Sequence, residues 1–141
     1  MQMSISEEEQ RRVVRLNPGK IAAGFNFSET VQLEAVSQNG DLIQYINNPS
    51  EAVQLMAVPK WGYAVQYIEN PSEAVKLAAV TQYGNAIKFI KNPSEAVQIA
   101  AVTQYPYYIE FIKNSSEAVQ IAAVTHNKLS EIRVKWYKWL R

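Results

Sequence analysis

The sequence predicts an all-α solenoid of about six helix-turn-helix repeats, closed by a C-terminal capping helix. Three observations predict this fold class: a repeat of fixed length, a helix-start motif at the head of each copy, and a helical spacing of the apolar residues inside it. An asparagine marks the start of each copy at intervals of 22 residues: Asn26, Asn48, Asn70, Asn92 and Asn114. Periods of about 20–50 residues are typical of solenoids, in which each repeat buries its apolar residues against its neighbours.

Each copy is expected to open with an α-helix of about ten residues. In the copy that begins at Asn70, the sequence Asn-Pro-Ser-Glu has the order of a helix start. Asn70 would be the N-cap, Pro71 the first helical residue, and Glu73 the residue whose carboxylate reaches back to the cap. Residues 74–80 are apolar except for Lys76, so we expect this helix to be buried on most sides.

A second, shorter helix of about seven residues is expected after a tight turn. Residues 86–90 are rich in β-branched and aromatic residues, which favours a strand and would give an α/β solenoid similar to leucine-rich repeats. A strand would alternate strictly, however, whereas the apolar residues here fall at i, i+1, i+3 and i+4, which is the spacing of a helix. An aromatic residue keeps the same slot in each copy and is expected in the core: Tyr45, Tyr67, Phe89 and Phe111.

The turn between the two helices carries a glycine in three copies and a proline in the next: Gly40, Gly62, Gly84 and Pro106. Proline cannot adopt a positive φ angle. This position is therefore expected to open the second helix, and not to cap the first helix in a left-handed conformation. Pro59 is expected to shorten the first helix of its own copy.

The chain is expected to form a single repeat domain over residues 1–141. Residues 4–25 match the repeat only at scattered positions and are expected to form a degenerate N-terminal cap, and residues 26–125 carry the core repeats. Residues 126–141 are basic and aromatic, and they are expected to form the capping helix, because an open solenoid end must be covered. The alternative is that this helix binds nucleic acid or a membrane surface.

Composition excludes several classes of protein. The 141 residues include 14 Lys and Arg, 13 Asp and Glu, and no cysteine, which excludes disulfides and thiolate metal sites. A formal net charge of +1 gives no overall attraction to nucleic acid or anionic lipid. No apolar run reaches the length of about 18 residues that a transmembrane helix needs, and the N-terminus lacks the order of a secretory signal. We therefore expect a cytoplasmic protein that does not bind membranes.

The phrase Asn-Pro-Ser-Glu-Ala-Val-Gln-Ile-Ala-Ala-Val-Thr-Gln-Tyr at residues 92–105 resembles a short α-helical repeat family that is catalogued as a domain of unknown function. The family occurs in effectors of intracellular bacteria and in some phage and large-virus proteins. The resemblance covers residues 26–125 and implies the solenoid fold. It implies no activity, because the family has no established catalytic motif. The departures from the family are Pro106, the aromatic-rich turns and the basic C-terminal extension.

Residues for catalysis are scarce, so we do not expect an enzyme, a metal site or a cofactor. The chain has one histidine, His126, and one aspartate, Asp41. Glutamates recur once per copy at the helix start, where a carboxylate is a capping device, and they lack the paired environment of acid–base catalysis: Glu29, Glu51, Glu73, Glu95 and Glu117. The glycines are scattered singly and form no phosphate-binding loop.

Aromatic residues around the inter-helix turn are the predicted partner-binding site: Trp61, Tyr63, Tyr83, Tyr105, Tyr107 and Tyr108. These positions vary between otherwise similar copies, so the scaffold does not dictate them. Repeats stacked about 10 Å apart would align the rings along one edge, and Tyr and Trp are common anchors in protein interfaces. The alternative is that some of these rings only cover the ends of the helix pairs.

Secondary candidates are a polar ladder on the first helix, a set of lysines that could contact nucleic acid, and two C-terminal tryptophans. The ladder comprises Gln32, Gln54, Lys76, Gln98 and Gln120; the lysines are Lys60, Lys76, Lys88, Lys91 and Lys113; the tryptophans are Trp136 and Trp139. The lysines are sparse, so nucleic acid is the less favoured partner. Exposure of either tryptophan would favour the alternatives for the C-terminal helix, including dimerisation.

The sequence therefore predicts a non-catalytic protein-binding repeat protein, either a monomer or a homodimer through the C-terminal helix. With the resemblance, this suggests an effector-like or phage-encoded inhibitor that acts by steric occupation of a host protein. The alternatives are a nucleic-acid-binding helical repeat and a homo-oligomeric structural or adaptor protein.

Overall fold

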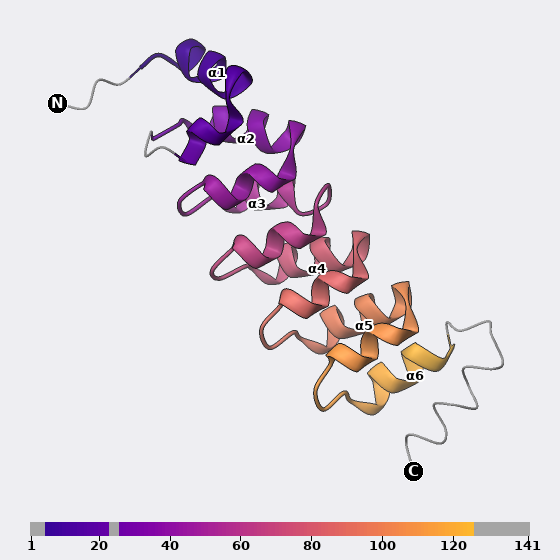
Figure 1. Ribbon diagram of the computed structural model, residues 1–141. Coiled ribbons are helices and arrows are strands. Elements are labelled where there is room, and N and C mark those ends of the chain that lie inside the picture. The colour runs from indigo at the N-terminus through magenta and orange to yellow at the C-terminus, as the bar shows by residue number, and fades with distance from the viewer. Residues whose placement is uncertain (1–4, 23–25, 126–141) are drawn as a thin grey trace.

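The computed structural model describes residues 5–22 and 26–125, which form an elongated stack of alternating α-helices and 3-10 helices (Figure 1). The α-helices are α1 (Glu7–Leu16), α2 (Glu29–Gln38), α3 (Glu51–Ala57), α4 (Glu73–Gln82), α5 (Glu95–Gln104) and α6 (Glu117–Thr125). The 3-10 helices are η1 (Pro18–Ala22), η2 (Gly40–Tyr45), η3 (Gly62–Tyr67), η4 (Gly84–Phe89) and η5 (Pro106–Phe111). The pairs recur at intervals of about 22 residues, so the predicted all-α solenoid is confirmed.

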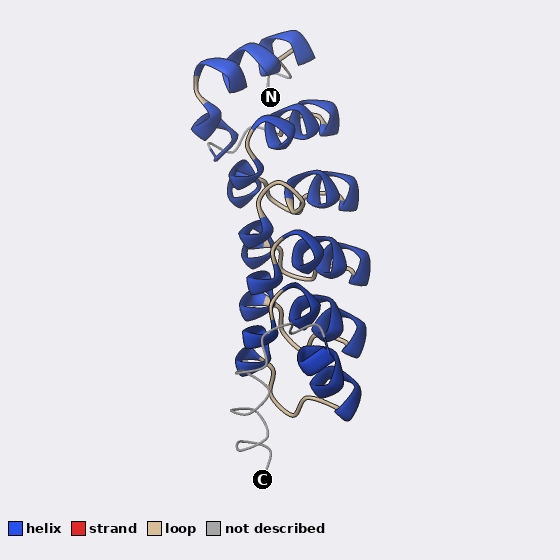
Figure 2. Cartoon of the chain, turned by 90° about the vertical axis from the view of Figure 1, so that its right-hand side faces the viewer, coloured by secondary structure: helices blue, strands red, loops and turns tan. Residues whose placement is uncertain are grey.

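The two types of helix occupy two columns that run the length of the stack (Figure 2). Successive α-helices pack against one another from α1 to α6, and successive 3-10 helices do so from η1 to η5. The layer of α1 and η1 lies at the end of the stack, where the sequence predicts the N-terminal cap repeat at residues 4–25. The predicted capping helix at residues 126–141, with Trp136 and Trp139, lies outside the described residues.

The α-helices begin two residues later than the sequence predicts, with serine and not asparagine as the N-cap. In α4, the Ser72 hydroxyl accepts a hydrogen bond from the Val75 amide at 3.3 Å, and Glu73 is the first helical residue. The predicted N-cap role of Asn70 is therefore wrong. In three copies the asparagine lies in the turn before the helix and has a positive φ angle, which asparagine adopts more readily than most residues. These residues are Asn48 at 49°, Asn92 at 47° and Asn114 at 55°.

The capping serine also joins successive repeats. Its hydroxyl donates a hydrogen bond to the glutamate that begins the α-helix of the preceding repeat, so that Ser94 donates to Glu73. The same bond recurs from Ser50 to Glu29, from Ser72 to Glu51 and from Ser116 to Glu95. The glutamate thus begins its helix and accepts a bond from the next repeat, which differs from the predicted capping box. We call these four bonds the Ser–Glu ladder.

In every α-helix except α4, where Lys76 takes its place, a glutamine fastens the loop that leads into that helix. The Gln98 side-chain amide donates to the Pro93 carbonyl at 2.9 Å, and Gln54 donates to the Pro49 carbonyl at 2.8 Å. The same contact is made by Gln10, Gln32 and Gln120. The predicted polar ladder on the first helix is therefore half-buried and largely engaged in holding its own loops.

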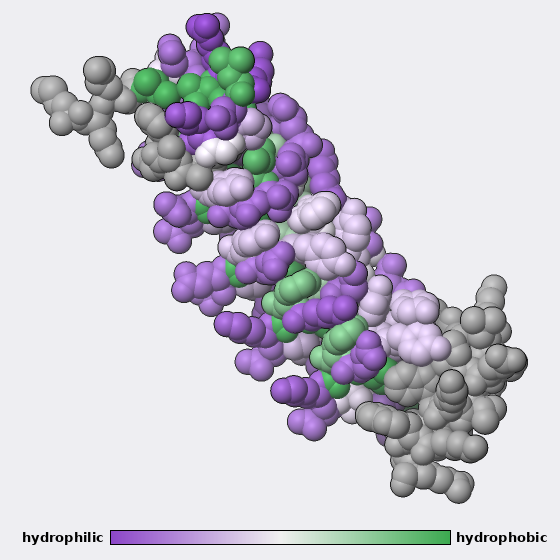
Figure 3. All heavy atoms as spheres, in the orientation of Figure 1, coloured by the Kyte–Doolittle hydropathy of each residue, from purple (hydrophilic) through white to green (hydrophobic). Residues whose placement is uncertain are grey.

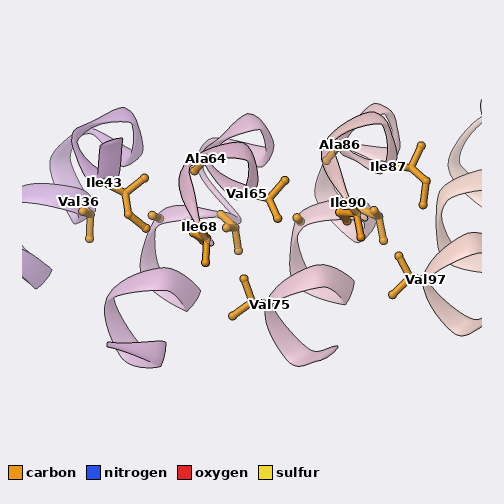
Figure 4. Close-up of a cluster of buried hydrophobic side chains, with 14 of the residues drawn as sticks. Val36, Ile43, Ala64, Val65, Ile68, Val75, Ala86, Ile87, Ile90 and Val97 are labelled. Carbon is orange, nitrogen blue, oxygen red and sulfur yellow. The ribbon is translucent and has the colours of Figure 1, made fainter. Parts of the chain in front are cut away.

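The core lies between the two columns as a continuous row of small and β-branched side chains (Figure 4). In α4, Val75, Ala79 and Val80 are fully buried, and the equivalent residues recur in the other core repeats. The 3-10 helices η2 to η5 each add two or three residues, such as Ile87 and the C-capping Ile90 of η4. Because the facing side chains are short, neighbouring helices can approach closely.

The second helix of each repeat is a 3-10 helix, and this changes the position of its aromatic residue. With three residues per turn, side chains three positions apart eclipse one another. Ile87 and Ile90 therefore form the inward row, and Phe89 lies beside that row. The prediction that this slot belongs to the core is wrong: Tyr45, Tyr67, Phe89 and Phe111 are all exposed.

The turn position occupied by glycine or proline opens the 3-10 helix, as the sequence predicts. Gly40, Gly62, Gly84 and Pro106 are the first residues of η2 to η5. The prediction for Pro59 is also confirmed, because α3 has 7 residues where α2, α4 and α5 have 10. The glycines are needed for close approach: a Cβ atom built on Gly62 would lie 2.4 Å from the Cβ atom of Tyr83 in the next repeat.

We predict that Gly62→Ala lowers the free energy of unfolding by about 2–3 kcal/mol, because the new methyl group overlaps atoms close to the backbone of the next repeat. Gly19→Ala is the matched control, since its Cβ atom would meet only the Asn17 side-chain oxygen at 3.3 Å. The control should change stability by less than about 1 kcal/mol. Urea denaturation followed by circular dichroism measures both, and equal effects would contradict close approach at Gly62.

We also predict that Ser94 and Glu73 are energetically coupled. Ser94→Ala removes an N-cap and a rung of the Ser–Glu ladder and should cost about 1–2 kcal/mol of unfolding free energy. In a double-mutant cycle with Glu73→Ala, the coupling energy should be about 0.5–1 kcal/mol. The control cycle pairs Ser94→Ala with Glu51→Ala, whose partner is Ser72, and it should be additive. Additivity in both cycles would show that the ladder contributes nothing.

Candidate functional site: an exposed aromatic face

One exposed ring per repeat lies on the side of the stack that the 3-10 helices form. The rings end η2 to η5, and their exposed fractions are 39% for Tyr45, 44% for Tyr67, 40% for Phe89 and 37% for Phe111. We call these four residues the aromatic ladder. The ladder follows from the 22-residue period together with the 3-10 geometry, which repeats the same side-chain position in each layer.

The turn aromatics predicted from the sequence lie at or near the start of the same 3-10 helices. Trp61, Tyr83 and Tyr105 each precede a 3-10 helix and are exposed, as is Tyr107 in η5. Two further members of the predicted set, Tyr63 and Tyr108, are half-buried. We call the aromatic ladder and these six turn aromatics together the aromatic face. Figure 3 shows a lengthwise band of pale and green side chains on this side of the stack.

Tyr63 connects the turn of one repeat with the ladder of the next. Its ring packs edge-on against Trp61, with centroids 6.1 Å apart, and against Phe89, with centroids 5.5 Å apart. The Asn85 side-chain amide also donates a hydrogen bond to the Tyr63 hydroxyl. Edge-to-face contacts of this kind restrict the rotation of both rings. The central part of the aromatic face is therefore a connected cluster.

A second cluster occupies the C-terminal part of the face, around η5. Tyr105 lies 5.0 Å from Tyr107 and 5.6 Å from Tyr108, measured between ring centroids. Tyr108 in turn lies 6.4 Å from Phe111. The Lys88 ammonium group lies 4.2 Å from the centroid of the Phe111 ring, which is a cation–π distance. The ladder residue of this repeat is thus held between a tyrosine and a lysine.

Tyr83 has a structural role as well as an exposed ring. Its hydroxyl donates to the Lys60 carbonyl of the preceding repeat at 3.0 Å, and its ring packs over Gly62. Part of the predicted site therefore does cover the ends of the helix pairs, as the alternative interpretation holds. The rings of Trp61, Tyr105 and Tyr107 contribute less to the packing between repeats.

The predicted lysine contacts do not form one surface. The Lys60 ammonium group donates to the Ser37 carbonyl, and Lys76 occupies the glutamine slot of α4, half-buried. Lys88, Lys91 and Lys113 are exposed and lie on or directly after η4 and η5. They give the C-terminal part of the aromatic face an excess of positive charge, with Glu110 as the acidic residue of η5. The N-terminal part carries Asp41 in η2 and Glu69 after η3.

Other surfaces of the described residues offer less. On the α-helices, Leu55, Met56 and Ile121 are exposed, but the slot shared by Leu55 and Ile121 is half-buried against the core in the other repeats, at Leu33, Leu77 and Ile99. Beside α1, an open hollow is lined by exposed charged residues of both signs, including Glu8, Glu9, Arg12 and Arg15. On neither surface do the side chains form an arrangement suited to binding a ligand.

No three His, Cys, Asp or Glu side chains in residues 5–22 and 26–125 come together as metal ligands. Over the same ranges, no helix has both the length and the apolar character needed to cross a membrane. His126, Trp136 and Trp139 lie outside these ranges.

Comparison of the chain with models of protein families, with curated proteins and with solved structures finds no match. The function must therefore be argued from the site itself.

Sequence reasoning assigned the aromatic ladder to the core and so missed the most regular part of the site. One signal in the sequence could have identified it. The slot holds tyrosine at residues 45 and 67 and phenylalanine at residues 89 and 111. A fully buried tyrosine hydroxyl needs a hydrogen-bond partner, so a slot that accepts either residue favours a ring whose tip reaches water.

We predict different stability effects for two adjacent tyrosines of the C-terminal cluster. Tyr108 packs between Gly84, Tyr105 and Phe111, so Tyr108→Ala should lower the free energy of unfolding by about 2–3 kcal/mol. Tyr107 is exposed, and among the described residues its ring contacts Tyr105 alone, so Tyr107→Ala should cost less than about 1 kcal/mol. Thermal unfolding of the two variants measures the difference. If Tyr108→Ala is as mild as Tyr107→Ala, Tyr108 is not part of the scaffold.

Proposed function

We propose that this chain is a non-catalytic protein-binding repeat protein that binds a protein partner through the aromatic face and acts by steric occupation of the partner's surface. The observation that carries the proposal is the aromatic ladder, a row of exposed rings with one ring in each of four successive repeats. Contiguous exposed apolar surface is uncommon in monomeric proteins and marks interaction sites. Tyrosine and tryptophan are enriched among the residues that dominate protein interfaces.

The fixed geometry of the rings also supports protein binding. Tyr63 holds Phe89, and Tyr108 and Lys88 hold Phe111, so these rings are already restricted before a partner arrives. Side chains that are ordered in advance lose less conformational entropy on binding. A surface of this kind is suited to a defined partner, because its shape is fixed by the scaffold.

Nucleic acid is the alternative partner, and the charges of the face argue against it. Lys88, Lys91 and Lys113 are accompanied by Asp41, Glu69 and Glu110, so three positive and three negative residues lie along η2 to η5 and the turns that follow them. Binding to a polyanion needs a clear excess of positive charge along the contact surface. The aromatic residues alone would allow base stacking, which is why the test below includes a nuclease step.

The sequence resemblance to a repeat family of bacterial effectors and phage proteins suggests the biological form of this activity. A small, repetitive protein that binds by its surface alone would inhibit a host protein by covering it. This part of the proposal is an analogy to the family. A homo-oligomeric structural or adaptor protein is the remaining alternative, and light scattering of the full chain addresses it.

The test is capture from a nuclease-treated cell lysate by the immobilised full chain, followed by quantitative mass spectrometry. The site variant is Trp61→Ala/Tyr67→Ala/Tyr105→Ala, which removes three exposed rings. The matched control is Leu55→Ala/Met56→Ala/Ile121→Ala, which removes three exposed apolar side chains from the α-helix column. We expect a partner whose affinity, measured afterwards with purified protein, falls at least about tenfold in the site variant and is unchanged in the control.

Circular dichroism must show that both variants are folded. A partner that binds both variants equally well would contradict the aromatic face as the binding site. Recovery of nucleic acid alone, in a parallel lysate without nuclease, would replace the proposal with the alternative.

A further inference from the structure

We propose that the aromatic face binds an extended, proline-rich segment in the polyproline II conformation, with acidic residues over the C-terminal repeats. This inference rests on the proposed function and specifies the partner for the same site. It depends on three observations: the spacing of the aromatic ladder, the chemistry of its rings, and the position of the lysines around it.

The spacing of the ladder is set by the packing of neighbouring helices. Helices in contact lie about 8–10 Å apart, and each layer contributes one ring. A polyproline II helix has three residues per turn and a rise of about 3.1 Å, so it presents the same side every 9.3 Å or so. A β-strand presents the same side about every 6.6 Å, and an α-helix about every 5.4 Å. The polyproline II segment is the conformation that places one side chain over each successive ring.

The chemistry of the rings suits proline. Recognition of polyproline II segments uses grooves lined by aromatic residues, which accept the apolar proline rings. Such a segment has no internal hydrogen bonds, so its carbonyl groups need donors. The hydroxyl groups of Tyr45 and Tyr67 and the indole N–H of Trp61 are donors attached to exposed rings. A proline-rich segment also loses little conformational entropy on binding, because it is already extended.

The charges give the segment a direction. The Lys88 ammonium group lies over the Phe111 ring, and Lys91 and Lys113 are exposed two residues after Phe89 and Phe111. In the N-terminal part of the face the corresponding positions hold Gln44, Gln66, Asn47 and Glu69, and Asp41 in η2 adds a second carboxylate. Acidic residues in the segment are therefore favoured over η4 and η5 and disfavoured over η2 and η3.

The experiment measures binding of fluorescein-labelled synthetic peptides to the full chain by fluorescence anisotropy. The first probe has about twelve residues, mostly proline, with two glutamates at one end, which is long enough to span the four rings. The second probe keeps the length and the glutamates but replaces proline by glycine and serine, which makes it flexible. The third probe is a single-stranded oligothymidine of about twelve nucleotides, which presents bases for stacking.

We expect the proline-rich probe to bind at least about tenfold more tightly than the glycine-serine probe. Phe89→Ala/Phe111→Ala should weaken its binding at least about tenfold, whereas Leu55→Ala/Ile121→Ala on the α-helix column should leave it unchanged. Lys91→Gln/Lys113→Gln, which leaves the contact between Lys88 and Phe111 intact, should weaken it about three- to tenfold, and should have no effect on an all-proline probe without glutamates. Circular dichroism confirms the fold of each variant.

Equal binding of the proline-rich and glycine-serine probes, or no binding of either, would overturn this inference. The proposed function would survive that result if a protein partner captured from lysate still depends on Trp61, Tyr67 and Tyr105. Binding of the oligothymidine without binding of the peptides would overturn the inference and favour nucleic acid. If the lysine variant also lost binding to the all-proline probe, the result would contradict the role proposed for the lysine charges.

Discussion

The close approach of neighbouring repeats is the constraint on which the rest of this structure depends. Where a Cβ atom would sit at Gly62, the next repeat already places Tyr83, and the buried faces between the columns consist of valine, alanine and isoleucine. Short side chains allow neighbouring helices to pack in close contact, about 8–10 Å apart. Every periodic feature of the surface inherits this spacing, because each layer repeats the same backbone at the same distance. The aromatic ladder is therefore a consequence of the scaffold's period as well as a feature of its own residues.

Polar contacts along the edge where the α-helices begin keep the layers in register. An apolar core of this kind permits sliding, since valine and alanine rows offer little directionality. The Ser–Glu ladder supplies the direction, because one serine hydroxyl accepts from its own helix and donates to the preceding one, as Ser94 does between Val97 and Glu73. In every layer except that of α4, a glutamine then fixes the loop to the helix that it precedes. Capping and stacking are thus performed by the same short motif, which explains why Ser-Glu recurs so regularly in the sequence.

The sequence predicted the features that depend on one residue's backbone chemistry, and it was less informative where two helical geometries compete. The period and the order of the helices follow from the repeat. The position of Pro106 at the start of η5 and the shortening of α3 by Pro59 follow from the fixed φ angle of proline. The N-cap was misplaced because asparagine and serine are both good caps and lie two residues apart. The second helix was expected, but not its 3-10 form. That form arises from tertiary packing in a segment of 6 residues, and it moved Phe89 out of the core.

The contrast between Tyr107 and Tyr108 shows how scaffold and surface are divided within this site. Both are tyrosines of the same 3-10 helix, yet Tyr108 packs over Gly84 in the preceding layer and Tyr107 does not. A ring that contacts the neighbouring layer stabilises the stack, and any role in partner binding is additional to this structural role. A ring such as Tyr67, on the outer side of a layer, can change without disturbing the stack. The individual rings can therefore vary from layer to layer while the spacing stays constant, and under the proposed function a partner would match the spacing first and the individual rings second.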